Sequence, residues 1–168
     1  GYMRNDKGFY FFMEAMKKID KDTCQNLDII IAAKNTNHHM MYEIKKLTKK
    51  FNNVFYFDGY NEKNVNEIMS IIDLGIIPSL WEDNLPQVAI EYHAKKIPIL
   101  SSNLGGSSEL NNKNELFVYN HKSKKELIEK ITHLVNYGYN EQEYCENTIK
   151  PITIENHCKE LISIYKSL

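Results

Sequence analysis

Residues 73–110 read DLGIIPSLWEDNLPQVAIEYHAKKIPILSSNLGGSSEL, and this stretch decides the fold class. Two short apolar runs, at 74–79 and 97–102, flank a segment with helical spacing at 86–94. Apolar runs without alternation are typical of strands that are buried on both faces of a parallel sheet. A strand, a helix and a second strand in succession therefore predict a βαβ unit.

The remainder of the 168-residue chain continues the alternation in both directions. About five strands and their helices predict an α/β fold, a Rossmann-like doubly wound parallel sheet with helices on both faces. Further strands are expected at 27–33, 53–59 and 116–119, and helices at 9–19, 39–51, 61–71, 123–137 and 141–167, the last interrupted at Pro151.

A doubly wound fold should place a strand before its first helix. Here that helix begins only a few residues after Gly1, so the strand is absent or nearly so. Because the chain also begins with Gly rather than Met, we interpret it as a piece excised from a longer protein.

Composition narrows the functional classes. Hydrophobic residues make up 42% and charged residues 26%, as in an ordinary soluble domain. A net charge of −1 argues against a dedicated nucleic-acid binder, which needs a basic excess. No apolar run is long enough to span a bilayer, and no signal peptide is visible. The three cysteines lack metal-type spacing and predict reduced thiols in a cytoplasmic protein.

The loop after the strand at 74–79 carries the richest chemistry. Ligands of such sheets bind beyond the carboxyl ends of the strands, and Glu82 and Asp83 lie there. Asn84 could cap the next helix, and Glu91 lies two turns into that helix. Paired acids suit sugar recognition because carboxylates accept hydrogen bonds from hydroxyls. Spacing alone favours a plainer interpretation, in which Glu82 and Asp83 stabilise a helix N-terminus and Glu91 is solvated.

Two glycine-containing loops are candidates for binding an anion. Gly105 and Gly106 follow a buried strand, so their N–H groups could cradle a phosphate, although a plain glycine turn is the alternative. Arg4 and Lys7 precede Gly8 at a helix start, where cationic side chains and the helix dipole act together. The chain has one Arg, so an anion site must rely on Lys, backbone N–H groups or Arg4.

The sequence lacks the common motifs of metal sites, P-loops and serine nucleophiles. We find no HxxxH, HExxH or CxxC pattern and expect no metal site. A P-loop and a GxSxG elbow are also absent from the sequence. The lysines of the helix at 39–51 indicate a helix face that is exposed to solvent. The alternative is that this face contacts the surface of an anionic membrane.

Taken in order, these segments resemble the C-terminal, donor-binding half of family 4 glycosyltransferases, retaining enzymes built from two facing Rossmann-like domains. The resemblance covers about residues 1–137. Its most specific part is the acid at Asp83, seven intervening residues, Glu91, and the Gly-Gly pair followed by Glu109. It implies that residues 1–168 form a nucleotide-sugar binding domain and that the N-terminal acceptor domain lies outside this chain.

The resemblance also implies roles for individual residues. Asp83 would contact the donor sugar, and Glu91 the ribose hydroxyls. The spacing falls on Asp83 where the family usually has Glu, and Glu82 stands one position earlier, so either acid could be the catalytic one. Lys7 matches the family's phosphate-binding lysine. The remaining donor-binding candidates are Arg4, Gly59, Tyr60, Asn84, Leu85, Gly105, Gly106 and Glu109.

The expected activity is transfer of a sugar from a nucleotide-sugar to a glycan or lipid-linked acceptor, without a cofactor or metal, in polysaccharide synthesis. Lys7 and backbone N–H groups would stabilise the leaving diphosphate. The isolated chain should transfer poorly or not at all, because acceptor groups come from the missing domain. Two alternatives stay open: a non-catalytic nucleotide-sugar binding module, and a nucleotide-sugar epimerase of the same architecture.

Overall fold

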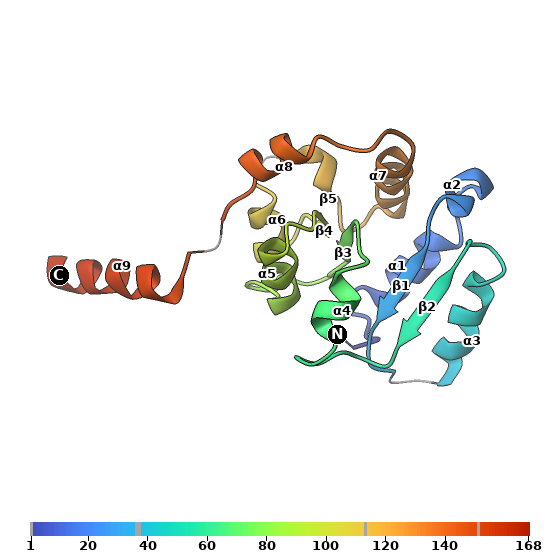
Figure 1. The fold of residues 1–168 in the computed structure, drawn as a ribbon, viewed down its shortest axis with the longest axis horizontal. Helices are drawn as coiled ribbons and strands as arrows, with labels where there is room; N and C mark the ends of the chain where they lie inside the picture. The colour runs from blue at the N-terminus through green and yellow to red at the C-terminus, as the bar shows by residue number, and fades with distance from the viewer. Residues whose placement is uncertain (1, 36–37, 113, 151) are drawn as a thin grey trace.

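A computed structural model describes residues 2–35, 38–112, 114–150 and 152–168 (Figure 1). The predicted interruption at Pro151 falls outside these residues. The strands are β1 (Ile29–Ala32), β2 (Val54–Phe57), β3 (Gly75–Ile77), β4 (Ile99–Ser102) and β5 (Val118–Tyr119). The helices are α1 (Phe9–Met16), α2 (Lys21–Gln25), α3 (His38–Leu47), α4 (Val65–Met69), α5 (Gln87–Ala94), α6 (Gly105–Leu110), α7 (Lys124–Tyr137), α8 (Glu141–Asn147) and α9 (Ile154–Ser167), with a 3₁₀ turn at Glu115–Phe117.

The strands confirm the predicted α/β architecture, and every pair of neighbours is parallel. They form two sheets rather than one: β1 pairs with β2, and the other sheet has the order β3-β4-β5. Ile29 lies opposite Val54 in the first sheet, and Gly75 lies opposite Ile99 in the second. The facing edges of the two sheets, β1 and β3, are not paired with each other in the described part of the chain.

One hydrophobic core joins the two sheets. It contains Ile29 and Ile31 of β1 together with Leu100 of β4 and Tyr119 of β5. Helices α1 and α7 pack against each other and bridge the sheets, and the Phe11 ring stacks on the Tyr119 ring at 6.2 Å between centroids. Burial of these side chains therefore holds both sheets to one pair of helices.

A smaller core covers the other face of the second sheet. Ala89 of α5 packs there with Ile77, Ile99 and Leu110. Helix α8 is joined to this layer through Tyr144, whose hydroxyl accepts a hydrogen bond from the Ile99 N–H at 3.0 Å. The β3–β4–β5 sheet is thus covered on both faces, as the continuous apolar runs predict.

Helix boundaries differ from the sequence expectation at several places. Helix α4 spans only Val65–Met69, because residues 61–64 form a turn in which Asn61 N–H donates to the Asn64 side chain. Helix α2 was not expected. Ser123 caps α7, as predicted, by accepting a hydrogen bond from the Glu126 N–H.

The C-terminal helix α9 projects away from the rest of the chain (Figure 1). It has a polar and an apolar side, yet none of its residues is buried. None of the helices in the described residues is both long and apolar enough to cross a membrane.

Candidate functional site

Two loops that are far apart in sequence meet at the carboxyl ends of the strands. Lys7, from the loop before α1, places its Nζ 2.7 Å from Oδ2 of Asp83, from the loop after β3. The same ammonium lies 5.1 Å from the centroid of the Trp81 ring. Both charged side chains are partly exposed, with relative accessibilities of 38% for Lys7 and 22% for Asp83, so a ligand can reach them.

Gly8 allows the loop before α1 to approach the segment that follows β3. Its φ is +71°, and a Cβ at this position would lie 1.5 Å from the carbonyl oxygen of Pro78. Only glycine fits such an approach. The Leu80 N–H also donates to the Asp6 carbonyl oxygen at 2.9 Å, which ties the first loop to the segment after β3.

The Gly105–Gly106 pair packs directly against the backbone of Asp83 and Asn84. A Cβ on Gly105 would lie 2.1 Å from the Asp83 carbonyl oxygen, and one on Gly106 would lie 1.7 Å from the Asn84 carbonyl oxygen. The Gly106 N–H donates to the Asp83 carbonyl oxygen at 2.9 Å. This N–H therefore already has a partner within the protein. The pair fixes the position of the acidic loop.

Glu91 lies on the first turns of α5 and contacts two side chains. Gln87 Nε2 donates to Glu91 Oε1 at 3.0 Å, as the i, i+4 spacing predicts. The Tyr60 hydroxyl lies 3.5 Å from Glu91 Oε2, a contact that joins the loop after β2 to α5. Burial, reinforced by the Glu91 charge, raises the pKa of Tyr60 to about 12, so this hydroxyl stays a donor at neutral pH.

The two acids of the loop after β3 have different environments in the structure. Asp83 is half-buried and paired with Lys7, whereas Glu82 is exposed. Asn84 and Leu85 are also exposed, although the Asn84 carbonyl oxygen packs against Gly106. Asn84 does not cap α5 as expected: the helix begins at Gln87, so its N-cap is Pro86, two residues after Asn84, with no side-chain cap hydrogen bond.

Arg4 and Glu109 have different surroundings from the candidates above. The Arg4 guanidinium binds both carboxylate oxygens of Asp6, each at 2.9 Å, so its charge is neutralised locally. Glu109 is exposed on α6. Asp6 was missed by the sequence analysis, and only its place beside Arg4 in an anion-binding loop could have indicated it.

The ends of β1 and β2 form the other side of the site. The Asp58 carboxylate accepts hydrogen bonds from the Asn35 N–H at 2.8 Å and the Tyr56 hydroxyl at 2.9 Å. These bonds hold the pKa of Asp58 below its usual value. Gly59 follows with a φ of +81°, which turns the chain so that Tyr60 reaches Glu91.

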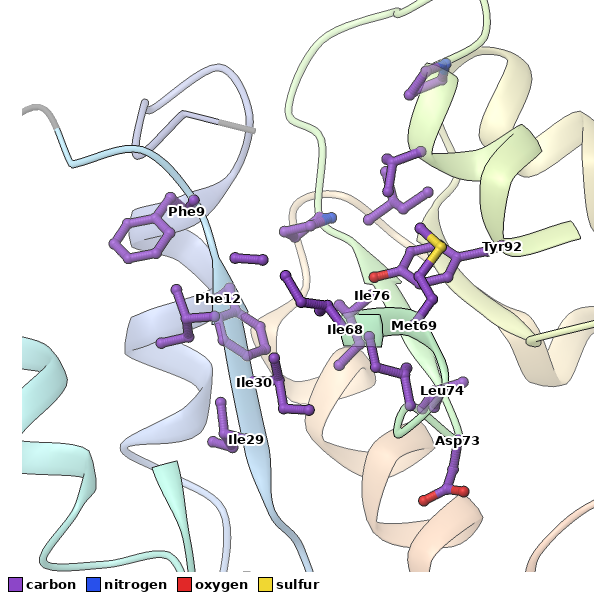
Figure 2. Close-up of a pocket in the computed structure, with 18 of the residues that line it drawn as sticks. Phe9, Phe12, Ile29, Ile30, Ile68, Met69, Asp73, Leu74, Ile76 and Tyr92 are labelled. Carbon is purple, nitrogen blue, oxygen red and sulfur yellow. The ribbon is translucent and has the colours of Figure 1, made fainter. Parts of the chain in front are cut away.

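A cavity of about 870 Å³ opens onto these residues. Its polar end is lined by Lys7, Tyr60, Asp83 and Gln87. The rest is lined mainly by apolar side chains, with Asp28 and Asp73 among the exceptions. It passes between β1 and β3, where Ile30 and Ile76 lie on opposite sides (Figure 2).

The polar end can bind a polyhydroxylated anion. The Lys7 ammonium, the Asp83 carboxylate and the neutral Tyr60 phenol line it, and the Glu91 carboxylate contacts Tyr60 from α5. An ammonium attracts phosphate oxygens, and carboxylates accept hydrogen bonds from sugar hydroxyls. Trp81, which the sequence analysis did not select, adds an aromatic face beside the ammonium.

Comparison with known proteins agrees with this arrangement. The sequence profile of the family described as "Glycosyl transferases group 1" matches residues 1–137. Among curated proteins, Protein CapJ of Staphylococcus aureus is 27% identical over 124 residues, which cover 74% of this chain and 30% of CapJ.

Two solved structures have the same fold. HepE of Anabaena, crystallised in complex with UDP-glucose, superposes with a TM-score of 0.71 at 17% identity, over 97% of this chain and 47% of HepE. A glycosyltransferase from Rickettsia africae gives a TM-score of 0.71 at 20% identity, over 99% of this chain and 46% of that protein. The chain thus spans about half the length of the structures it matches and less than a third of CapJ.

Proposed function

The chain belongs to the group 1 glycosyl transferases, and on that premise we propose that it binds the nucleotide-sugar donor of a retaining hexosyltransferase of the family 4 type. The acceptor in this proposal is a glycan or a lipid-linked sugar, and the process is polysaccharide synthesis in the cytoplasm, with or without attachment to a membrane surface. The observation that carries the proposal is the pairing of Lys7 with Asp83 in a cavity that is also lined by Tyr60 and Gln87, the two side chains that contact Glu91.

Lys7 is the group assigned to the diphosphate. When the bond between the sugar and the diphosphate breaks, negative charge grows on the leaving phosphate. The Lys7 ammonium lies at the start of α1, whose N-terminal dipole adds to its charge. Lys7 and the N-terminus of α1 would supply this stabilisation without a metal ion. Asp83 now neutralises Lys7, so a diphosphate would compete with that carboxylate for the ammonium.

Asp83 and Glu91 are assigned to different parts of the donor. Asp83 lies beside the cation that would hold the diphosphate, where the donor sugar begins. Glu91 and Tyr60 lie further along α5 and the loop after β2, which suits the two ribose hydroxyls. Asn84 and Leu85, which are exposed next to Asp83, are also assigned to the sugar.

The acceptor site belongs to the part of the relatives that this chain does not cover. The chain matches 47% of HepE and 46% of the Rickettsia africae enzyme. We therefore assign donor binding to this chain and transfer to the larger protein, and we expect residues 1–168 alone to be inactive.

A non-catalytic nucleotide-sugar binding module is the second candidate, and the Arg4–Asp6 pair favours it. A second cation would strengthen stabilisation of the leaving diphosphate, yet Arg4 is neutralised by both oxygens of Asp6. Release of free sugar from the donor by the full-length protein distinguishes the two candidates, because only an enzyme cleaves the donor.

Calorimetric titration tests the donor-binding proposal itself. UDP, GDP and their sugar derivatives are titrated into residues 1–168, with thermal unfolding as a second readout. We expect one of the sugar nucleotides to bind and to raise the unfolding temperature. Absence of binding and of stabilisation by every nucleotide at millimolar concentration would contradict the proposal.

A further inference from the structure

Strand β2 is the outer strand of the first sheet. It pairs with β1 on one side, and no strand of the described residues pairs with its other side. Figure 1 shows β1 between β2 and the β3–β4–β5 sheet, so the unpaired side of β2 faces away from both sheets. Proteins commonly protect such an edge with a lysine or a proline, because an open edge pairs with other chains. Val54–Phe57 contains neither a charged residue nor a proline.

The backbone groups on the open side of β2 belong to Val54 and Tyr56. In a parallel ladder one residue directs its N–H and C=O to one neighbour, and the next residue directs both to the other side. The Asn53 carbonyl oxygen accepts a hydrogen bond from the Ile29 N–H at 2.9 Å, so Asn53 and Phe55 direct these groups to β1. Val54 and Tyr56 therefore direct theirs outward, where no described strand accepts them.

The side chain of Phe55 is also incompletely covered. Val54 and Tyr56 pack against the main core, so Phe55, which lies between them, points to the opposite face of the sheet. Its exposed fraction is 47%, although it lies in the middle of a strand. An aromatic ring at an open edge gains a packing partner when another strand is added beside it.

We propose that β2 pairs antiparallel with β2 of a second copy of this chain, around a two-fold axis at Phe55. In an antiparallel pair, residues that direct their backbone groups toward each other exchange two hydrogen bonds, and the residues between them are opposite without bonding. Val54 of each copy then bonds to Tyr56 of the other. The two Phe55 side chains lie opposite each other at the axis, on the same face of the joined sheet.

The register follows from the outward groups. Pairing Val54 with Tyr56 uses every outward group of β2, whereas a shift of two residues places one of them opposite a residue beyond the strand. A shift of one residue brings groups that are already bonded to β1 to the new interface. In the proposed register Asn52 of each copy lies opposite Asp58 of the other, and both are exposed. An amide can donate to a carboxylate, and no like charges face each other along the pair.

A second copy suits this edge because the edge is complementary to itself. The same four residues supply the donors, the acceptors and the aromatic ring at positions that match under a two-fold axis. Such an interface closes at two copies and does not propagate. A single strand pair is a small interface, so the dimer should be weak. The paired strands run in opposite directions, so the two Lys7–Asp83 sites lie at opposite ends of the joined sheet and both stay open.

Sedimentation velocity and hydrogen exchange test the proposal on residues 1–168. Both are measured from about 1 µM to about 1 mM, a range that covers the dissociation constants of weak complexes. The exchange rates of the Val54 and Tyr56 amides report on the new interface, and the Phe55 amide, which faces β1, is the internal reference. The variants are Phe55→Lys and Phe55→Glu, measured separately and mixed. Tyr137→Lys, at an 80% exposed aromatic residue of α7, is the control.

We expect a dimer at high concentration, with exchange at Val54 and Tyr56 slowed by about tenfold or more and exchange at Phe55 unchanged. Phe55→Lys and Phe55→Glu should each be monomeric, because like charges would meet at the axis. Their mixture should dimerise, and Tyr137→Lys should behave as the unmodified chain does. The dimer restored in the mixture shows that both variants are folded.

Three results would overturn the proposal. The first is a monomer at every concentration, with unchanged exchange at Val54 and Tyr56. The second is a dimer that persists in Phe55→Lys, which would assign the contact to another surface, such as the exposed apolar side of α9. The third is slow exchange at Val54 and Tyr56 at every concentration without dimers, which would mean that the edge is covered within one chain. Nucleotide affinity is a separate readout, so failure here leaves the donor-binding proposal standing.

Discussion

Lys7 and Asp83 lie 76 positions apart in the chain, yet their side chains form an ion pair of 2.7 Å. The pair joins the loop before α1 to the loop after β3. It is partly exposed, so its contribution to stability is about 1 kcal/mol or less. Its importance is that it places a cation beside the acid that we propose contacts the donor sugar.

The glycine at 105 should be irreplaceable for the shape of the site. Gly105→Ala adds a Cβ 2.1 Å from the Asp83 carbonyl oxygen at a residue with a φ of +61°. Gly138→Ala is the matched control, because Gly138 also has a positive φ, +69°, but nothing within 4 Å of its Cβ position. We expect the control to cost about 1–2 kcal/mol and Gly105→Ala about 2 kcal/mol more, measured by urea unfolding. Equal losses would show that the contact with Asp83 is unimportant.

Asn111 should be the most sensitive polar residue of the second sheet. Its buried side-chain amide donates to the carbonyl oxygens of Ile99 at 2.7 Å and Phe117 at 2.9 Å, and it accepts from the Tyr144 hydroxyl at 3.2 Å. Asn111→Leu leaves these groups without partners. We expect a loss of about 3 kcal/mol in the free energy of unfolding.

The control for Asn111 is Asn66→Ala, on the exposed side of α4. This change should alter the free energy of unfolding by less than about 0.5 kcal/mol. A loss at Asn111 no larger than the loss at Asn66 would mean that the buried network contributes little.

Stability in acid should depend on Glu43, which joins α3 to α1. Its carboxylate binds Lys17 at 2.7 Å and Lys46 at 2.8 Å, and these bonds lower its pKa from 4.5 to about 2. A carboxyl group with a lowered pKa stabilises the fold at pH values above its ordinary pKa. That contribution is lost as the pH falls from 4.5 toward 2.

Glu43→Gln should therefore flatten the dependence of the unfolding temperature on pH in that acidic range and lower stability at neutral pH. Glu129→Gln is the control, because Glu129 is exposed and its nearest ammonium, on Lys125, is 3.7 Å away. The control should keep the pH profile of the unmodified chain. An unchanged profile in Glu43→Gln would refute this role.

Glu91 should matter for the nucleotide rather than for the sugar. If it binds the ribose, Glu91→Gln weakens binding of the free nucleoside diphosphate and of the sugar nucleotide by the same factor, about tenfold. Glu62→Gln, an exposed carboxylate in the turn after Tyr60, serves as the control. Unchanged affinity for the nucleoside diphosphate in Glu91→Gln would exclude the ribose assignment.

The sequence predicted the strand and helix alternation because each apolar run is a local signal. It also predicted the contact between Gln87 and Glu91, which depends only on helical spacing. The division into two sheets was not predicted, because strand pairing depends on partners distant in sequence. The sequence analysis left open whether Glu82 or Asp83 is the catalytic acid and did not predict the Lys7–Asp83 ion pair, which depends on the loop that Gly105 packs against.

For some residues, nothing in the neighbouring sequence indicated the contacts that they make in the structure. Asn111 and Tyr144 read as ordinary polar and aromatic positions, yet they meet across 33 residues in a buried hydrogen bond. The Arg4–Asp6 pair was also missed, because the sequence analysis considered Arg4 only as a ligand for an anion.

Titration of Asp83→Asn tests the central claim, that the Lys7–Asp83 edge binds a nucleotide-sugar donor. UDP- and GDP-sugars and the corresponding diphosphates are titrated calorimetrically into the unmodified chain, Asp83→Asn and Glu82→Gln, which removes the same charge from the neighbouring exposed residue. We predict that the unmodified chain and Glu82→Gln bind one sugar nucleotide more tightly than its diphosphate. Asp83→Asn should lose about tenfold in affinity for the sugar nucleotide, and it should bind the diphosphate at least as tightly as the unmodified chain does, because Lys7 then has no carboxylate partner. The claim is contradicted if Asp83→Asn binds both ligands as the unmodified chain does.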